Sequence, residues 1–119
     1  MERVCDGVTA DQIGRDLWLV AVSGEQDAAT APRIEELVRR VRRDGADLVI
    51  DLSEATFIDS SIAGILVRHA LPADGAQSPG VAVVLASGGF PDRVLRVLGL
   101  EQMLPAHRTR QEAQRALGR

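Results

Sequence analysis

The sequence contains no lysine and no tyrosine, and it has one tryptophan, two phenylalanines and one cysteine among its 119 residues. With so few aromatic side chains it lacks the stacking surfaces on which many proteins bind single-stranded nucleic acids. Its net charge of −3 also argues against nucleic-acid binding, which needs a basic face. The lone Cys5 cannot form an intramolecular disulfide, and we interpret it as a small apolar residue in a protein of a reducing compartment.

Long hydrophobic runs are missing as well. No stretch reaches the roughly 18 apolar residues that cross a membrane, and residues 1–12 lack the apolar segment of a signal peptide. Hydrophobic residues make up 45% of the chain and charged residues 26%, which is the balance of a packed globular domain. We therefore expect residues 1–119 to form one cytoplasmic domain that contacts neither membranes nor nucleic acids.

Short apolar runs predict buried strands at residues 17–22, 48–52 and 81–86. Residues 8–13 are expected to pair with 17–22 as an antiparallel hairpin, and Met103 and Leu104 are candidates for a short edge strand. The order of strands and helices indicates an α/β fold with a mixed, mostly parallel sheet of four to five strands and about four helices. Loops 24–30, 53–61 and 86–91 are then expected to converge at the carboxyl ends of the strands.

Four segments carry the apolar spacing of amphipathic helices. They begin near Thr30, Ser60, Pro91 and Thr109. The two threonines are expected N-caps, Glu112 completes a capping box, and Gly45 is expected to end the first helix. Glu35 precedes Arg39 by four positions, on what we expect to be the solvated face of that helix. A loop is expected at residues 74–80.

Four short motifs follow these elements in order. They are Gly24 to Asp27, Asp51 to Ser53, Phe57 to Ser61 and Leu98 to Leu100. In this order and spacing they resemble the STAS domain of anti-sigma-factor antagonists, over nearly the whole chain. The resemblance implies a STAS-like fold and a binding protein that needs no cofactor. It also implies that the chain is not an enzyme.

The Asp-Ser-Ser motif is where the resemblance implies a function. In the family, the first serine is phosphorylated by a partner anti-sigma factor with a histidine-kinase-like ATP site, and a metal-dependent serine phosphatase removes the phosphate. In this sequence that serine is Ser60. The unphosphorylated protein is then expected to bind the anti-sigma kinase and to be released by phosphorylation. The expected partner-contacting residues are Asp27, Asp59, Ser60, Ser61 and Ile62.

Other interpretations of these residues stay open at this point. A serine hydroxyl at a helix N-terminus meets unpaired backbone N–H groups, so Ser60 or Ser61 could be an ordinary N-cap, with Ser61 the better candidate. Asp59 could orient the Ser60 hydroxyl, contact the kinase or only favour the helix dipole. Asp27 could belong to the partner surface or begin the turn into the first helix.

One departure from the family pattern concerns Ile62. The family usually has Gly-Leu-Gly after the two serines, whereas this chain has Ile62-Ala63-Gly64. Adjacent helical positions point about 100° apart, so we expect Ile62 to move bulk toward the kinase-facing first turn. Ile62 favours one alternative function, an interaction module that does not switch. Another alternative is a sensor of a small ligand or nucleotide that binds in the crevice at the strand ends.

A catalytic or metal site is not indicated. His69 and His107 are interpreted as packing residues, too far apart to form a metal pair. Ser60 has no neighbouring histidine to act as a base, so an activated nucleophile is not expected. Gly88 and Gly89 precede a helix and could approach a phosphate, but a turn is the simpler interpretation.

Overall fold

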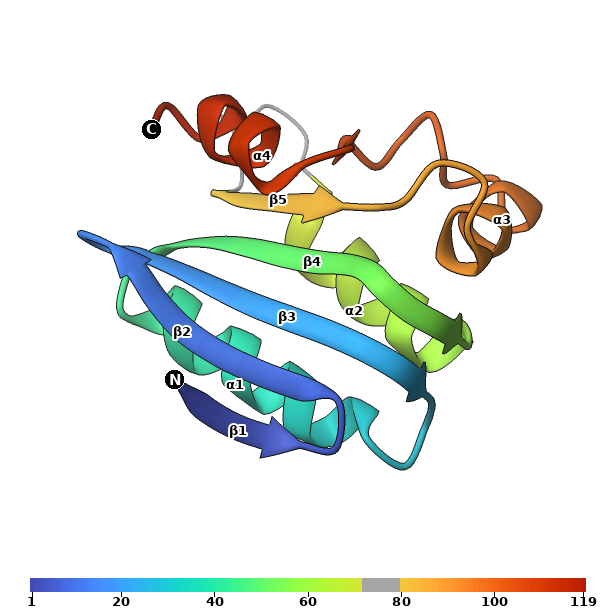
Figure 1. Cartoon of the computed structure of the whole chain (residues 1–119), viewed down its shortest axis with the longest axis horizontal. Helices are drawn as coiled ribbons and strands as arrows, with labels where there is room; N and C mark the ends of the chain where they lie inside the picture. Colours follow the sequence, from blue (N-terminus) through green and yellow to red (C-terminus); the bar gives the residue numbers. More distant parts are fainter. Residues whose placement is uncertain (72–79) are drawn as a thin grey trace.

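The computed structural model describes residues 1–71 and 80–119. Within them six strands form one sheet in the order β1-β2-β3-β4-β5-β6, and four helices pack against it (Figure 1). The strands are β1 (Glu2–Cys5), β2 (Val8–Gly14), β3 (Leu17–Gln26), β4 (Asp47–Ile58), β5 (Val81–Val84) and β6 (Ala106–His107). The helices are α1 (Ala31–Arg43), α2 (Ser60–Ala70), α3 (Phe90–Val97) and α4 (Arg110–Ala116).

The sheet is mixed, as expected. β1, β2 and β3 pair antiparallel, whereas β3 to β6 pair parallel. The sheet has six strands where four to five were expected, because β1 buries little besides Cys5 and so carries no apolar signal. The edge strand is at Ala106–His107 and not at Met103 and Leu104, because Leu104 lies in a turn and is buried in the core.

Two strands run further than their apolar runs indicate. β3 continues to Gln26 and β4 to Ile58, so residues 24–26 of the expected loop 24–30 and residues 53–58 of the expected loop 53–61 are extended strand. The two strands pair in parallel up to the match of Gln26 with Ile58, with register shifts on the way. Backbone pairing between distant segments therefore outweighs the weak strand preference of the polar residues. As a consequence, β4 delivers residue 59 directly to the start of α2.

Helices cover both faces of the sheet. One hydrophobic cluster joins α1 and α2 to residues of the central strands that include Val20 and Ile50. A smaller cluster on the opposite face joins Ala113 of α4 to Leu19 and Val49. Successive strand residues point to opposite faces, which explains why the central strands are apolar almost throughout. Cys5 belongs to the larger cluster, and burial raises the pKa of its thiol.

The helix caps agree only in part with those predicted from the sequence. Thr30 stands at the N-cap position of α1, but its side chain makes no cap hydrogen bond. Gly45 has a φ of 80°, the left-handed conformation expected after α1. Thr109 Oγ1 accepts a hydrogen bond from Glu112 N at 3.1 Å, which confirms the cap of α4. The expected loop at residues 74–80 lies outside the described residues except for Gly80.

A partly buried ion pair joins α4 to the sheet. Arg110 Nε donates to Asp51 Oδ2 at 2.6 Å, and the Asp51 side chain is only 6% exposed. Burial acts to raise the pKa of the Asp51 carboxyl, but hydrogen bonds from Ser53 and Arg110 outweigh it and the pKa lies below its ordinary value. The aspartate of the Asp51 to Ser53 motif is thus part of the scaffold.

Candidate functional site

Ser60 is the first residue of α2, and it is exposed beside the ends of β3 and β4. The N-cap is Asp59, whose Oδ1 accepts hydrogen bonds from Ser61 N at 2.9 Å and from Ile62 N at 3.2 Å. The interpretation of Ser60 or Ser61 as the cap is therefore wrong. Within residues 1–71 and 80–119 the Ser60 hydroxyl has no hydrogen-bond partner, so its oxygen is available for chemistry.

Asp59 also ties the loop before α1 to the start of α2. Its second oxygen, Oδ2, accepts a hydrogen bond from Ala28 N at 3.1 Å. Asp27 is exposed in this loop, and its Oδ1 accepts from Ala29 N at 2.9 Å. The structure thus places the Asp27 loop next to the Asp-Ser-Ser motif, as the convergence of loops predicts. Asp59 is a positioning residue for both segments.

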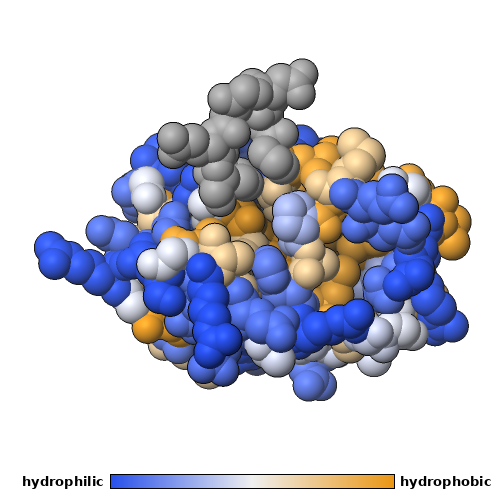
Figure 2. Space-filling model, turned by 90° about the horizontal axis from the view of Figure 1, so that it is seen from above, coloured by the Kyte–Doolittle hydropathy of each residue, from blue (hydrophilic) through white to orange (hydrophobic). Residues whose placement is uncertain are grey.

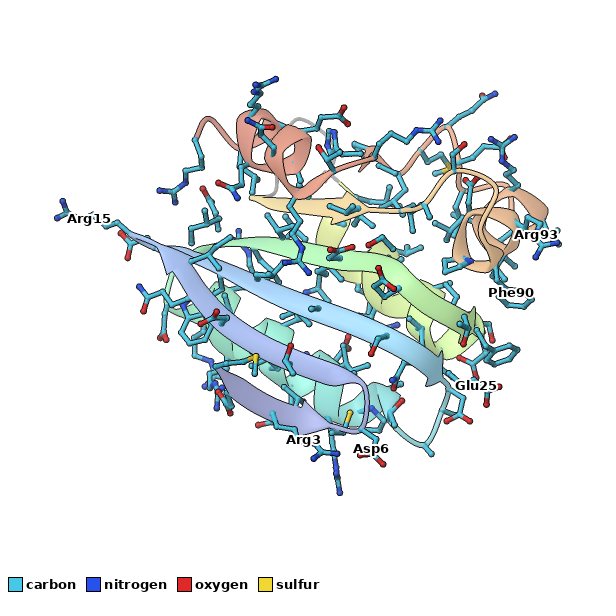
Figure 3. All side chains as sticks on the ribbon, viewed as in Figure 1. Arg3, Asp6, Arg15, Glu25, Phe90 and Arg93 are labelled. Carbon is cyan, nitrogen blue, oxygen red and sulfur yellow. The ribbon has the colours of Figure 1, made fainter. Side chains whose placement is uncertain are left out.

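The third predicted loop, residues 86–91, is held beside the other two by an aromatic contact that the sequence did not indicate. Phe57 at the end of β4 stacks on Phe90 at the start of α3, with ring centroids 5.2 Å apart and planes at 29°. The guanidinium of Arg93 lies 5.8 Å from the centre of the Phe90 ring. Figure 3 shows Phe90 and Arg93 at the same end of the molecule as Glu25 of β3. Three segments therefore meet at this end of the sheet.

An apolar cavity of about 370 Å³ lies on one side of Ser60, and we call it the α3 groove. It is lined by Ser60, Phe90, Arg93, Val94, Val97 and Leu98. Val97 is 86% exposed and Leu98 47% exposed, which is unusual for residues of their size and apolarity. Figure 2 shows hydrophobic residues at the surface on the side where Figure 1 places α3. Val97 and Leu98 therefore form part of the exposed surface of the α3 groove.

A second cavity, of about 430 Å³, lies on the other side of Ser60 between α1 and α2, and we call it the α1–α2 groove. Its lining includes Pro32, Glu35, Ser60, Ser61 and Arg68. Two charged side chains, Glu35 and Arg68, line it, whereas the lining of the α3 groove has one, Arg93. Ser60 therefore stands on the ridge between an apolar groove and a charged one, where a change of its own charge affects both.

Glu35 is the centre of the charged groove. Its carboxylate accepts hydrogen bonds from Arg39 at 3.1 Å and from Arg68 at 2.9 and 3.1 Å, and it lies 3.1 Å from His69 Nε2. The pair with Arg39 is confirmed, but Glu35 is only 15% exposed and is not on a solvated face. Burial acts to raise the pKa of Glu35, yet the hydrogen bonds and charge of Arg68 hold it below its ordinary value.

Ile62 was predicted to contact the partner, but the structure shows that it is buried. Its side chain is 2% exposed and belongs to the core cluster beneath the sheet. The expectation that Ile62 adds bulk to the outer face of the first turn is therefore wrong. Position 62 lies on the inner face of α2 because it shares that face with Ile65 and Leu66, three and four positions further on, which are also buried. Asp27, Asp59, Ser60 and Ser61 all retain some exposure.

The histidines and the glycine pair do not form a metal or phosphate site among residues 1–71 and 80–119. No group of three or more His, Cys, Asp or Glu side chains there could hold a metal ion. His69 pairs with Glu35, and His107 lies in β6. The Gly88 amide donates to Asp92 Oδ2 at 2.9 Å, so its own helix uses the group that a phosphate would need. In this part of the chain, no helix has the length and apolarity to cross a membrane.

Comparison with known proteins places this geometry in a family. The family model described as "STAS domain" matches residues 8–113. A solved anti-sigma factor antagonist from Mycobacterium paratuberculosis is 31% identical, with a TM-score of 0.77 over 96% of this chain and 97% of that one. A comparison with curated proteins finds no match.

Two more distant structures share the fold. A putative anti-sigma factor antagonist from Thermotoga maritima is 18% identical, with a TM-score of 0.73 over 94% of this chain and 95% of that one. The phosphorylated form of the Bacillus cell fate determinant SpoIIAA is 17% identical, with a TM-score of 0.61 over 92% of this chain and 98% of that one. The family model and the 31% identical relative together cover almost the entire sequence. The chain belongs to the STAS domain family, and its structural neighbours are anti-sigma factor antagonists.

Proposed function

We propose that this protein is an anti-sigma-factor antagonist of the cytoplasm that is switched by phosphorylation of Ser60. In its unphosphorylated form it binds an anti-sigma factor that has a histidine-kinase-like ATP site, and phosphorylation releases it. The observation that carries the proposal is the exposed Ser60 hydroxyl, left without a hydrogen-bond partner among the described residues because Asp59 caps the helix. A serine needed only as a cap would have its oxygen engaged with the backbone.

The proposed chemistry leaves the chain in the role of substrate. The Ser60 oxygen attacks the γ-phosphorus of ATP held by the partner, the new O–P bond forms, the bond to ADP breaks, and the hydroxyl proton passes to a base of the partner. A metal-dependent serine phosphatase reverses the state by delivering water to phosphorus, which returns the serine hydroxyl and inorganic phosphate. Neither step requires a catalytic residue from this chain.

The proposed partner surface surrounds Ser60 on both sides. It comprises Asp27, Asp59, Ser60, Ser61 and the α3 groove. Phosphorylation places about −1.5 to −2 charges at the centre of this surface. A buried apolar contact around the α3 groove cannot solvate such a charge, and a loss of about 4 kcal/mol of binding energy weakens association about a thousandfold. Such a change is large enough for a switch.

Labelling with the cognate kinase tests the proposal directly. Incubation with that kinase and ATP should add one phosphate, located by mass spectrometry at Ser60, and Ser60→Ala should abolish it. Ser61→Ala is the matched control, because Ser61 is adjacent and does not cap the helix with its side chain. Absence of labelling with a kinase that binds the protein would refute the switch.

Partner binding gives a second, independent readout. Ser60→Glu should weaken the complex with the anti-sigma factor, whereas Ser60→Ala should leave it intact. Equal dissociation constants for the two variants would support the non-switching interaction module instead.

A further inference from the structure

A guanidinium group with unused donors lies in the same groove as Ser60. Glu35 holds Arg68 by two parallel hydrogen bonds, from Nε to Oε1 at 2.9 Å and from Nη2 to Oε2 at 3.1 Å. In the part of the chain that the structure describes, Nη1 of Arg68 has no hydrogen-bond partner. Since arginine carries five N–H donors in a rigid fork, Glu35 fixes the plane of the group and leaves the two Nη1 donors unspent.

Gly64 allows Nη1 to lie against the helix. A Cβ atom built on Gly64 would be only 3.0 Å from Nη1 of Arg68. A side chain at position 64 would therefore crowd this nitrogen, and glycine leaves room for it. Gly64 follows Ser60 by four positions, which places it on the same face of α2 and about 6 Å along the axis. Ser60 and Arg68 both line the α1–α2 groove. No side chain at position 64 separates the serine from the guanidinium.

The charge around this point favours an anion. The single carboxylate of Glu35 is shared by Arg39, Arg68 and His69, so two guanidinium groups face one negative charge. The carboxylate of Asp59, at the start of α2, already accepts three backbone hydrogen bonds. A phosphate dianion at Ser60 would therefore meet, in the groove, Arg68 donors that Glu35 has already oriented.

We propose that Arg68 is the internal phosphate-binding residue for phosphorylated Ser60, with Nη1 donating to the phosphate while Glu35 holds the guanidinium in place. This inference rests on the proposed function, because it assigns a ligand to the phosphate which that function requires. The ligand class is a phosphomonoester dianion attached to the chain itself. Binding draws the phosphate into the α1–α2 groove, so the phosphorylated form presents a filled groove to the partner and a shielded ester to the phosphatase.

The test installs phosphoserine at position 60 during translation, so that no kinase is needed, and follows its titration by ³¹P nuclear magnetic resonance. The second ionisation of phosphoserine has a pKa near 6, and a nearby cation favours the dianion. This pKa should be lower by at least about 0.5 unit in the Arg68-containing protein than in Arg68→Gln, a partial effect because Arg68 is half exposed. Thermal unfolding of each variant checks that the fold is retained.

Two further variants separate direct binding from general charge. Arg39→Gln removes another cation bound to Glu35 that does not line the groove, so it should move the phosphoserine pKa by less than half as much. Gly64→Ala places a methyl group against Nη1 and should raise the pKa toward the Arg68→Gln value, while alanine favours the helix.

Equal phosphoserine pKa values in the parent protein and in Arg68→Gln would overturn the inference, and so would equal effects of Arg39→Gln and Arg68→Gln. Either result leaves the proposed function standing, because the labelling experiment depends on the kinase and not on Arg68. Failure of kinase labelling, in turn, leaves the resonance measurement readable, because the phosphate is installed without the kinase.

Discussion

Removing the Asp59 side chain tests the assignment of Asp59 as the N-cap of α2, which positions Ser60. Asp59→Ala deletes the acceptor for Ser61 N and Ile62 N and releases the hydrogen bond from Ala28 N. The first turn of α2 then has unpaired donors, and the Asp27 loop loses its tie to that turn. Both the stability of the domain and the position of Ser60 should change.

The expected loss follows from the contacts. An N-cap side chain contributes about 0.5 to 2 kcal/mol. The bond to Ala28 adds about 0.5 kcal/mol, at the low end for a hydrogen bond because the loop is exposed and water can replace the acceptor. The free energy of unfolding should thus fall by about 1 to 2.5 kcal/mol. For 119 residues the unfolding entropy is about 0.25 kcal/mol/K, so Tm should fall by about 4 to 10 °C.

Thermal unfolding followed by circular dichroism measures this shift. Asp59→Ser keeps one cap acceptor but cannot reach Ala28 as well, so its Tm should lie between those of the parent and Asp59→Ala. Asp27→Ala is the matched control, since Asp27 bonds only within its own exposed turn. If Asp59→Ala and Asp27→Ala lowered Tm equally, the cap assignment and the reasoning from it would be refuted.

Three other outcomes are expected. Ser60→Ala should leave Tm unchanged within about 1 °C, because the cap belongs to another residue; a fall like that of a lost cap would contradict this. Val97→Asp in the α3 groove should weaken partner binding at least tenfold without loss of stability, since Val97 is 86% exposed, and isothermal titration calorimetry with the anti-sigma factor would show it. Arg110→Gln should make acid unfolding begin at higher pH. The lowered pKa of Asp51 in the folded protein stabilises the fold above the ordinary pKa of the carboxyl, and this stability is lost as the pH falls through the folded pKa. The variant removes the Arg110 hydrogen bond and so raises the folded pKa of Asp51. An acid-unfolding midpoint unmoved by Arg110→Gln would show that the ion pair adds nothing.

Much of the fold could be predicted because its signals are local. The stripe of Ile34, Leu37, Val38 and Val41 places α1, and all four side chains are buried. The N-cap at Thr109 and the left-handed glycine after α1 were also correct, since each depends on neighbours within a few residues. Glu112 departs from the expected capping box, because its side chain accepts from Arg108 N and not from Thr109 N. The motif residue Ser60 was correctly placed at the exposed start of a helix for the same reason.

The details of the site depend on distant partners. Three cap-forming residues in a row, Asp59 to Ser61, leave the N-cap undecided until β4 pairs with β3 as far as Ile58. Local preference cannot resolve such a choice, because each of the three side chains can accept the same hydrogen bonds.

By itself, the sequence determined the order of the strands from β2 to β5 and of the helices, the apolar faces of the helices and the exposed serine motif, because residues close in the chain generate those patterns. Only the tertiary structure decided that Phe57 stacks on Phe90 and that Glu35 forms ion pairs with Arg68 and His69. It also decided that Ser60 lines both the apolar α3 groove and the charged α1–α2 groove. These contacts join segments more than thirty residues apart, and packing of the helices against the sheet brings them together.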